Sequence, residues 1–231
     1  MKKIPGVLII SVLFLSCGID EYYYLPQIPQ NNITTSADTE ANIIIPRDYD
    51  VNYLFFTNFA IYYKMYVGTE PYADINFNSD LRNDYNAISP YTNPANTSGG
   101  AIDNLFRTRN YNELYFENET NDSMMPKAGG TQQTLRIIFP TDPSEQAYAR
   151  RNTNNEKISL CRSIIDFQPD RFFLNSPILR THSLNTDVSK REGGEYVCVS
   201  LYIVAIGYDS NLFKPIFSKP TFIGNFKLNA S

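Results

Sequence analysis

Two stretches decide the fold: residues 195–208, EYVCVSLYIVAIGY, and residues 51–67, VNYLFFTNFAIYYKMYV. Side chains in both stretches alternate between two faces, which is the pattern of a β-strand and not of a helix. One face of the first stretch is apolar and consists of Val197, Val199, Leu201, Ile203 and Ala205. One face of the second holds Phe59, Ile61, Tyr63 and Met65, and the other holds Ala60, Tyr62, Lys64 and Tyr66. We therefore expect two long strands in a mainly β protein, with a turn or bend at Asn58.

Shorter signals complete the predicted secondary structure. Apolar and β-branched segments predict further strands, at residues 41–45, 134–139, 158–167, 172–174 and 214–228. The last of these is broken by Pro215 and Pro220, which suits an edge or a strand end. Short helices are expected over residues 79–88 and 101–107. A third is expected to open at Asp142, because Pro143 and Glu145 then fit the first helical turn.

The N-terminus has the three parts of a secretory signal. Lys2 and Lys3 precede an apolar run over residues 7–15, and a small residue, Ser16, follows it. The run is about half of the roughly 20 residues that a membrane-spanning helix needs. We predict a signal peptide over residues 1–16. Residues 17–40 are rich in Pro, Asn and Thr and read as an extended tether, and residues 41–231 read as a single domain.

The charge of the chain bears on its partners. It has 20 basic and 24 acidic residues, a formal net charge of −4. Removal of Lys2 and Lys3 with the signal leaves 18 basic residues against 24 acidic ones, or −6. Binding to nucleic acid needs clustered Lys and Arg facing phosphates, so we expect no nucleic-acid partner.

The residues before the predicted cleavage point carry a family resemblance. Residues 13–17, Leu-Phe-Leu-Ser-Cys, resemble the lipobox of bacterial lipoproteins, in the looser form of spirochaete-type lipoproteins. The resemblance implies that Cys17 becomes the first residue and receives acyl chains, several of which hold a protein firmly on a membrane. Gly18 stands where Asp would signal retention in the inner membrane. The implied location is the cell envelope, and more specifically the outer membrane, on its surface or its periplasmic face.

The two long strands carry a second resemblance. Residues 59–66 are similar to the third strand of fibronectin type III domains, residues 199–207 to the sixth, and residues 215–220 to the start of the seventh. This implies an immunoglobulin-like β-sandwich of two sheets. Two features depart from the family: the chain has no Trp for the usual core position, and the third and sixth strands are far apart. We therefore expect a long insertion at about residues 68–190 that contains short helices.

Few residues are candidates for chemistry. Cys161 and Cys198 are the cysteines after Cys17, and they could form a disulfide or remain buried thiols. His182 is the only histidine and lies in no nucleophile motif, so we expect no catalytic residue, no cofactor and no zinc site.

One segment has some features of a calcium loop. Oxygen-bearing side chains alternate in it, at Asp74, Asn76, Asn78 and Asp80. An EF-hand needs Gly at its sixth position and Glu at its twelfth, which here are Ser79 and Tyr85. We interpret the segment as a turn between elements, and we expect no metal.

The sequence thus predicts a lipid-anchored, non-enzymatic envelope protein with a binding or structural role, such as adhesion or envelope assembly. Its 17 Tyr residues and many Asn residues suit adaptable contacts with a protein or glycan. Two alternatives remain open. One is a periplasm-facing accessory subunit of an envelope complex, and the other is a carbohydrate hydrolase that uses a pair of carboxylates.

Overall fold

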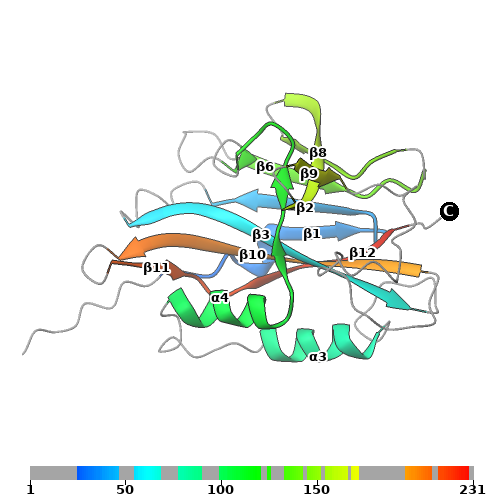
Figure 1. The fold of residues 1–231 in the computed structure, drawn as a ribbon. Coiled ribbons are helices and arrows are strands. Elements are labelled where there is room, and N and C mark those ends of the chain that lie inside the picture. The colour runs from blue at the N-terminus through cyan, green and yellow to red at the C-terminus, as the bar shows by residue number, and fades with distance from the viewer. Residues whose placement is uncertain are drawn as a thin grey trace, which may run out of the picture.

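The fold is mainly β and is built from two antiparallel sheets and two short α-helices within the described part of the chain (Figure 1). It is given by a computed structural model. The model describes residues 25–46, 55–68, 78–89, 99–120, 124–125, 133–142, 145–151, 154–165, 168–171, 196–209 and 213–228.

The smaller sheet has five strands and contains both long stretches. Strand β10 (Tyr196–Asp209) lies at its centre and pairs on one side with β3 (Phe56–Gly68). On the other side β10 pairs with β11 (Lys214–Phe217) near one end and with β12 (Thr221–Leu228) over the rest of its length. The short strand β4 (Asn112–Glu113) is added beyond β3. Because β11 is an outer strand, Pro215 lies at an edge, as predicted.

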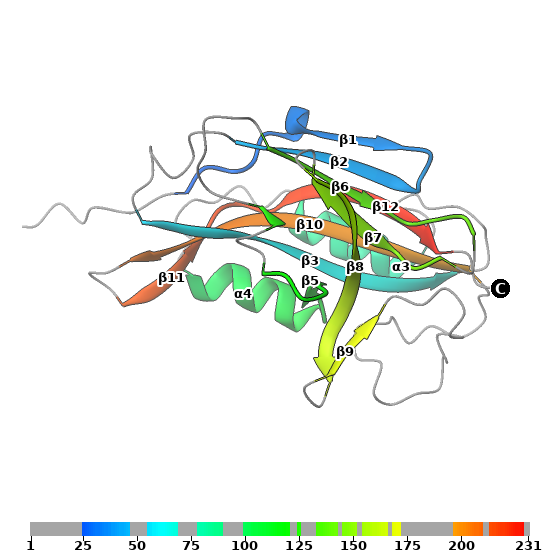
Figure 2. The same ribbon diagram turned by 90° about the horizontal axis from the view of Figure 1, so that it is seen from above.

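The larger sheet has seven strands, and all its pairings are antiparallel. Its strands are β1 (Ile33–Ser36), β2 (Glu40–Ile45), β6 (Gln133–Ile138), β7 (Tyr148–Arg151), β8 (Asn154–Ile165), β5 (Tyr115–Phe116) and β9 (Gln168–Arg171). In Figure 2, β1 and β2 run across the view whereas β8 runs down it. The larger sheet is thus strongly curled into a half-barrel, because the direction of its strands turns from one side of the sheet to the other.

The helices cover the outer face of the five-stranded sheet. Helices α3 (Ser79–Ile88) and α4 (Gly99–Thr108) both lie below that sheet in Figure 1, on the side away from the larger sheet. A 3-10 turn, η1 (Gln30–Asn32), precedes β1. The described residues therefore form three layers: a curled sheet, the central five-stranded sheet, and two helices.

Two hydrophobic cores follow from this arrangement. The odd-numbered residues of β3 and β10, such as Ile61 and Leu201, belong to the core between the sheets. Even-numbered residues, such as Tyr202, pack instead against Ile102 and Phe106 of α4. The alternation predicted from the sequence is confirmed, and both faces of the central sheet are buried.

Most of the long elements lie where the sequence predicts them. The helices over residues 79–88 and 101–107 correspond to α3 and α4. The strand over residues 51–67 corresponds to β3, which is one strand from Phe56 onward. The expected bend at Asn58 has a counterpart, because the register with β10 shifts between the pairs Ile206↔Asn58 and Gly207↔Phe56. The predicted strand at residues 172–174 lies outside the described residues.

One predicted helix is not formed. The backbone N–H of Glu145 donates to the carbonyl of Asp142 at 3.1 Å, which closes a single turn. The chain then extends, and β7 begins at Tyr148. No helix is formed over the described residues 145–151, because residues 148–151 pair in a sheet.

The predicted tether is wrong for residues 25–40. Leu25 and Ile28 are buried in the core between the sheets, and Ile33 belongs to the same core. The side chain of Gln27 donates to the carbonyl of Pro220 at 3.0 Å, and the hydroxyl of Thr221 donates to the carbonyl of Ile28 at 2.7 Å. These residues read as a tether because β1 exposes most of its side chains and so has few apolar residues. Residues 1–24 lie outside the described part.

The idea of an insertion at about residues 68–190 also needs correction. This part of the chain supplies β5, β6, β7, β8 and β9, which make up most of the larger sheet, and it adds β4 to the smaller one. Leu135, Ile137 and Leu160 from this region lie in the core between the sheets. The region is therefore an integral part of the double-sheet fold. The short helices within it cover the face of the smaller sheet that points away from the larger sheet.

The substitution Ile28→Ala tests whether the N-terminal residues belong to the fold. Ile28 is fully buried, so its truncation should leave a cavity and lower the free energy of unfolding by about 2–5 kcal/mol. Thr34→Ala is the control, because Thr34 is exposed in β1 and its change should stay within about 0.5 kcal/mol. Urea unfolding of both variants measures the difference. An Ile28→Ala variant as stable as the parent would contradict the packing described here.

Candidate functional site

A cluster of polar side chains lies between the central sheet and the helices. Lys64 and Tyr66 stand on the helix-facing side of β3, because side chains alternate along a strand and the odd-numbered neighbours face the other sheet. Both side chains are buried. A buried lysine is rare unless it has a partner. We therefore expect an acidic group opposite this face of β3.

Helix α3 supplies that group. Its start is fixed by Asn78, whose side-chain oxygen accepts from the backbone N–H of Asp80 at 2.7 Å and of Leu81 at 3.4 Å. The side-chain amide of Asn78 also donates to the carbonyl of Val67 at 2.7 Å, which ties the first turn of the helix to the end of β3. Leu81, Asp84 and Ile88 are the buried residues of α3. Their spacing of three and four residues is that of one helix face, so Asp84 is turned toward the sheet.

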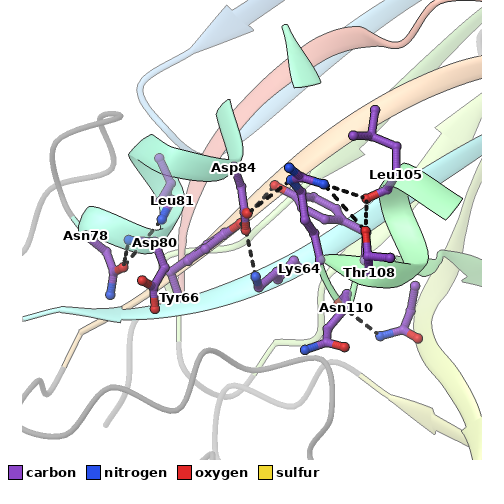
Figure 3. A network of polar contacts seen from close by, with 12 residues as sticks. Lys64, Tyr66, Asn78, Asp80, Leu81, Asp84, Leu105, Thr108 and Asn110 are labelled. Atoms are coloured by element: carbon purple, nitrogen blue, oxygen red, sulfur yellow. Dashed lines mark hydrogen bonds and ion pairs between the residues drawn. The ribbon is translucent and has the colours of Figure 1, made fainter. Parts of the chain in front are cut away.

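The carboxylate of Asp84 is the centre of the cluster (Figure 3). The Nζ atom of Lys64 lies 2.6 Å from Asp84 Oδ2. The hydroxyl of Tyr66 donates to the same oxygen at 2.7 Å. The oxygens of Tyr66 and Tyr111 are 2.9 Å apart. A tyrosine has one O–H proton and Tyr66 gives it to the carboxylate, so Tyr111 is the donor in that contact.

A second cation reaches the other carboxylate oxygen. Arg109 Nε lies 3.6 Å from Asp84 Oδ1, and Arg109 Nη1 donates to the carbonyl of Leu105 at 3.4 Å. The ammonium of Lys64 also lies over two aromatic rings, 5.0 Å from the centre of Tyr66 and 5.8 Å from that of Tyr111. Such positions attract a cation to the negative face of the ring. We call Lys64, Tyr66, Asp84, Arg109 and Tyr111 the Asp84 cluster.

The tyrosines around the cluster are held in the neutral form. Burial raises the pKa of Tyr66 far above its ordinary value, and the nearby Tyr111 and Asp84 raise it further. Burial also raises the pKa of Tyr111. The pKa of Tyr202 is raised first by burial and then by Tyr111. These phenols therefore stay protonated at any physiological pH and do not act as bases or nucleophiles.

The chemistry of the Asp84 cluster is that of a closed structural contact. Its carboxylate faces two cations and a phenol, so its charge is balanced and its oxygens are occupied. It joins β3, α3 and the segment that follows α4. The carboxylate is paired with Lys64. A glycoside hydrolase would instead need a second carboxyl group beside it.

Several of the residues that the sequence singles out are not among those that the structure describes. Cys17 and His182 lie outside the described residues, as do Asp74 and Asn76 of the segment with calcium-loop features. Asn78 of that segment is a helix cap and donates to a backbone carbonyl.

The two cysteines of the domain lie in different sheets. Cys161, on β8, is paired with Tyr115 of β5, and Cys198, on β10, lies opposite Tyr66 of β3. Both are buried and neither takes part in a disulfide. The disulfide left open by the sequence is thus not formed: Cys198 packs with Tyr66 and Leu81 on the helix side of the central sheet, whereas Cys161 lies in the other sheet.

The Asp84 cluster was missed by the sequence analysis. A lysine in a strand face otherwise made of Ala and Tyr is one signal, and an aspartate between Leu81 and Ile88 on a helix face is another. Each alone reads as an ordinary exposed charge. Their meeting depends on how α3 docks on β3, which no local pattern reports.

Comparisons with known proteins identify no relative. The chain matches no protein-family profile, no curated protein and no solved structure. Over the residues that can be described, no three His, Cys, Asp or Glu side chains are grouped as metal ligands would be. Across the same residues, neither helix combines the length and apolarity needed to cross a bilayer.

The substitution Asp84→Asn tests the role of the cluster. It removes the charge that balances Lys64 while keeping the size of the side chain, so a buried ammonium is left without its counter-ion. We expect the free energy of unfolding in urea to fall by about 3–5 kcal/mol. The matched control is Asp80→Asn on the same helix. Asp80 is only half-buried in the first turn, and its loss should cost at most about 1 kcal/mol through the helix dipole.

A double variant separates the buried charge from the packing. Replacing both buried partners, as in Lys64→Met with Asp84→Leu, removes the buried pair and leaves only the charge of Arg109, which is partly exposed to solvent, so the stability should recover most of the loss. Equal free energies of unfolding for Asp84→Asn and Asp80→Asn would show that the cluster does not contribute to stability.

The raised tyrosine pKa values predict instability at alkaline pH. The unfolded chain can ionise these phenols near their ordinary value of 10.0, whereas burial keeps Tyr66, Tyr111 and Tyr202 protonated in the fold. Their stabilising effect is complete below pH 10.0 and is lost as the pH rises further, by about 1.4 kcal/mol per pH unit for each phenol. Absorbance at the tyrosinate band, recorded with circular dichroism, should show these groups ionising together with unfolding. Complete ionisation of all tyrosines before any loss of fold would refute this.

Proposed function

We propose that this chain is a lipid-anchored lipoprotein of the bacterial cell envelope, and that its double-sheet domain has a non-enzymatic binding or structural role. The anchor is Cys17, and the membrane is reached through its acyl chains. Adhesion to a protein or glycan, or a part in an envelope assembly, are the activities that such a domain would serve.

The observation that carries this proposal is the stretch Leu-Phe-Leu-Ser-Cys at residues 13–17, which resembles a lipobox and ends a segment with the parts of a secretory signal. The short distance along the chain between Cys17 and the fold adds to it. Leu25, the first described residue, is already buried, and it lies only eight residues after Cys17. Eight residues reach at most about 29 Å even when fully extended. A cysteine with acyl chains would thus hold the domain close to the membrane surface, as a displayed module.

The Asp84 cluster supports the non-enzymatic part of the proposal. It is the place where the described residues gather buried charges and phenols with raised pKa, features that often mark active sites. Here each group is engaged with another: Lys64 with Asp84, Tyr66 with Asp84, and Tyr111 with Tyr66. The perturbed groups are thus explained by a contact between layers.

A finer proposal concerns the fold family. We infer a fibronectin type III-like arrangement, in which the third, sixth and seventh strands share a sheet. The order β11-β10-β3-β4 supports it, because the strands similar to the seventh, sixth and third of that family are neighbours in this order. The other sheet, with seven strands, departs from the family in its size.

The substitution Cys17→Ala tests the anchor. Without the thiol no diacylglycerol can be attached, so the protein should lose metabolic labelling with palmitate and leave the membrane fraction. Cys161→Ala is the matched control, because Cys161 is buried in the domain and should not affect labelling. Palmitate labelling that persists in Cys17→Ala would rule out the proposed attachment site.

Protease treatment of intact cells then separates the two faces of the outer membrane. If the domain is displayed on the surface, protease should digest it in intact cells whose wild-type protein is labelled with palmitate and bound to the membrane. Full protection of a labelled protein, with digestion only after the envelope is opened, would exclude host adhesion and favour the periplasm-facing accessory subunit.

A further inference from the structure

The hairpin between β10 and β11 exposes two large apolar side chains. Tyr208 is 47% exposed and Phe213 is 79% exposed, and they are the exposed large hydrophobic residues of the part that the structure describes. Tyr208 stands near the end of β10 and Phe213 just before β11 begins. Lys214, beside Phe213, is exposed as well. This end of the molecule thus combines two aromatic side chains with a cation.

The backbone of Phe213 adds a second observation. Its φ angle is +52°, in the left-handed region that suits Gly or Asn and that costs an ordinary residue about 1–2 kcal/mol. Its side chain is exposed, so packing within the domain does not offset this cost. An aromatic residue in a strained and exposed position indicates a role outside the stability of the fold.

The N-terminal segment enters the fold at the same end. The carbonyl of Ile28 accepts from Thr221, which is the register partner of Ile203 on β10. Three residues earlier, the Leu25 side chain lies 3.0 Å from the point where a Cβ atom of Gly207 would stand. From Ile28 back to Leu25, the chain therefore runs along β10 toward the β10–β11 hairpin.

The tip of the hairpin lies a short distance beyond the point where Leu25 packs. Gly207 pairs with Ile216, and the pairs of Tyr208 and Asp209 follow it toward the tip. At a rise of about 3.3 Å per residue, Phe213 lies roughly 10 Å beyond the point where Leu25 packs. Cys17 is at most about 29 Å of chain from Leu25. An anchor at Cys17 would thus bring the hairpin end of β10, and not its Tyr196 end, toward the bilayer.

We propose that the β10–β11 hairpin is a second membrane contact, in which Phe213 and Tyr208 enter the interfacial region of the bilayer that holds the lipid anchor. This inference rests on the proposed anchoring at Cys17. Tyr208, whose ring carries a hydroxyl, favours the level of the lipid headgroups, Phe213 can enter the boundary with the acyl chains, and Lys214 there can face anionic headgroups. Two contacts, one through acyl chains and one through the hairpin, would fix the orientation of the domain on the membrane.

A single-tryptophan probe tests the contact directly. The chain contains no Trp, so the full-length lipidated variant Phe213→Trp carries one reporter at the hairpin. The protein is reconstituted in vesicles of phosphatidylethanolamine and phosphatidylglycerol. We expect the emission to move to shorter wavelength on vesicle binding, quenching by aqueous iodide to be largely lost, and quenching by brominated lipid to appear.

The matched control is Tyr196→Trp, at the opposite end of the same strand. Its emission and its quenching by iodide should not change on vesicle binding. If the indole of the vesicle-bound Phe213→Trp variant remains as accessible to iodide as in solution, the hairpin contact is overturned while the anchor stands. Equal shielding of both probes would overturn the proposed orientation.

Failure of the anchor is a distinct outcome. A wild-type protein that neither labels with palmitate nor sediments with vesicles would overturn the proposed function, and the hairpin contact with it.

Discussion

The pairing of β3 with β10 is the constraint on which the rest of the structure depends. It runs in antiparallel register from Tyr196↔Gly68 to Gly207↔Phe56, the longest pairing in the described chain. Most side chains of both strands are buried on both faces, so the sheet that they form must be covered twice. The curled sheet covers the face with Ile61 and Leu201, and helices α3 and α4 cover the face with Tyr202. The three layers follow from this double burial.

The Asp84 cluster is the consequence of covering the second face with helices. A wholly apolar interface would leave the position of α3 on the sheet weakly defined, whereas a single buried ion pair is satisfied at one position only. The cap at Asn78 fixes one end of the helix through Val67, and Asp84 fixes its middle through Lys64. Breaking one partner of such a pair is costly because the remaining charge stays buried. The cluster thus specifies how the helix layer sits on the sheet.

The success of sequence reasoning here depended on periodicity. The long strands and both helices repeat their pattern often enough to be recognised, and the predicted ranges agree with β3, β10, α3 and α4. Short strands such as β4 and β5, with two residues each, carry no period at all. Strand β1 buries only Ile33 of its four residues, so its segment resembled a polar tether. The Asp84 cluster depends on contacts between residues 64, 84 and 109, which only tertiary structure brings together.

The correction at residues 25–40 changes how a lipid anchor would present this domain. A tether over residues 17–40 would provide height through a flexible chain, with the domain free to tumble. Because Leu25 packs beside Gly207, the distance from the membrane to the far end of the domain would be set instead by the length of the strands. Strand β10 has 14 residues and spans about 45 Å at a rise of about 3.3 Å per residue. It runs from the hairpin end, where the N-terminal segment enters, to Tyr196, opposite Gly68. An anchor at Cys17 would therefore set the Tyr196 end as the face farthest from the membrane, and a rigid strand would hold it there.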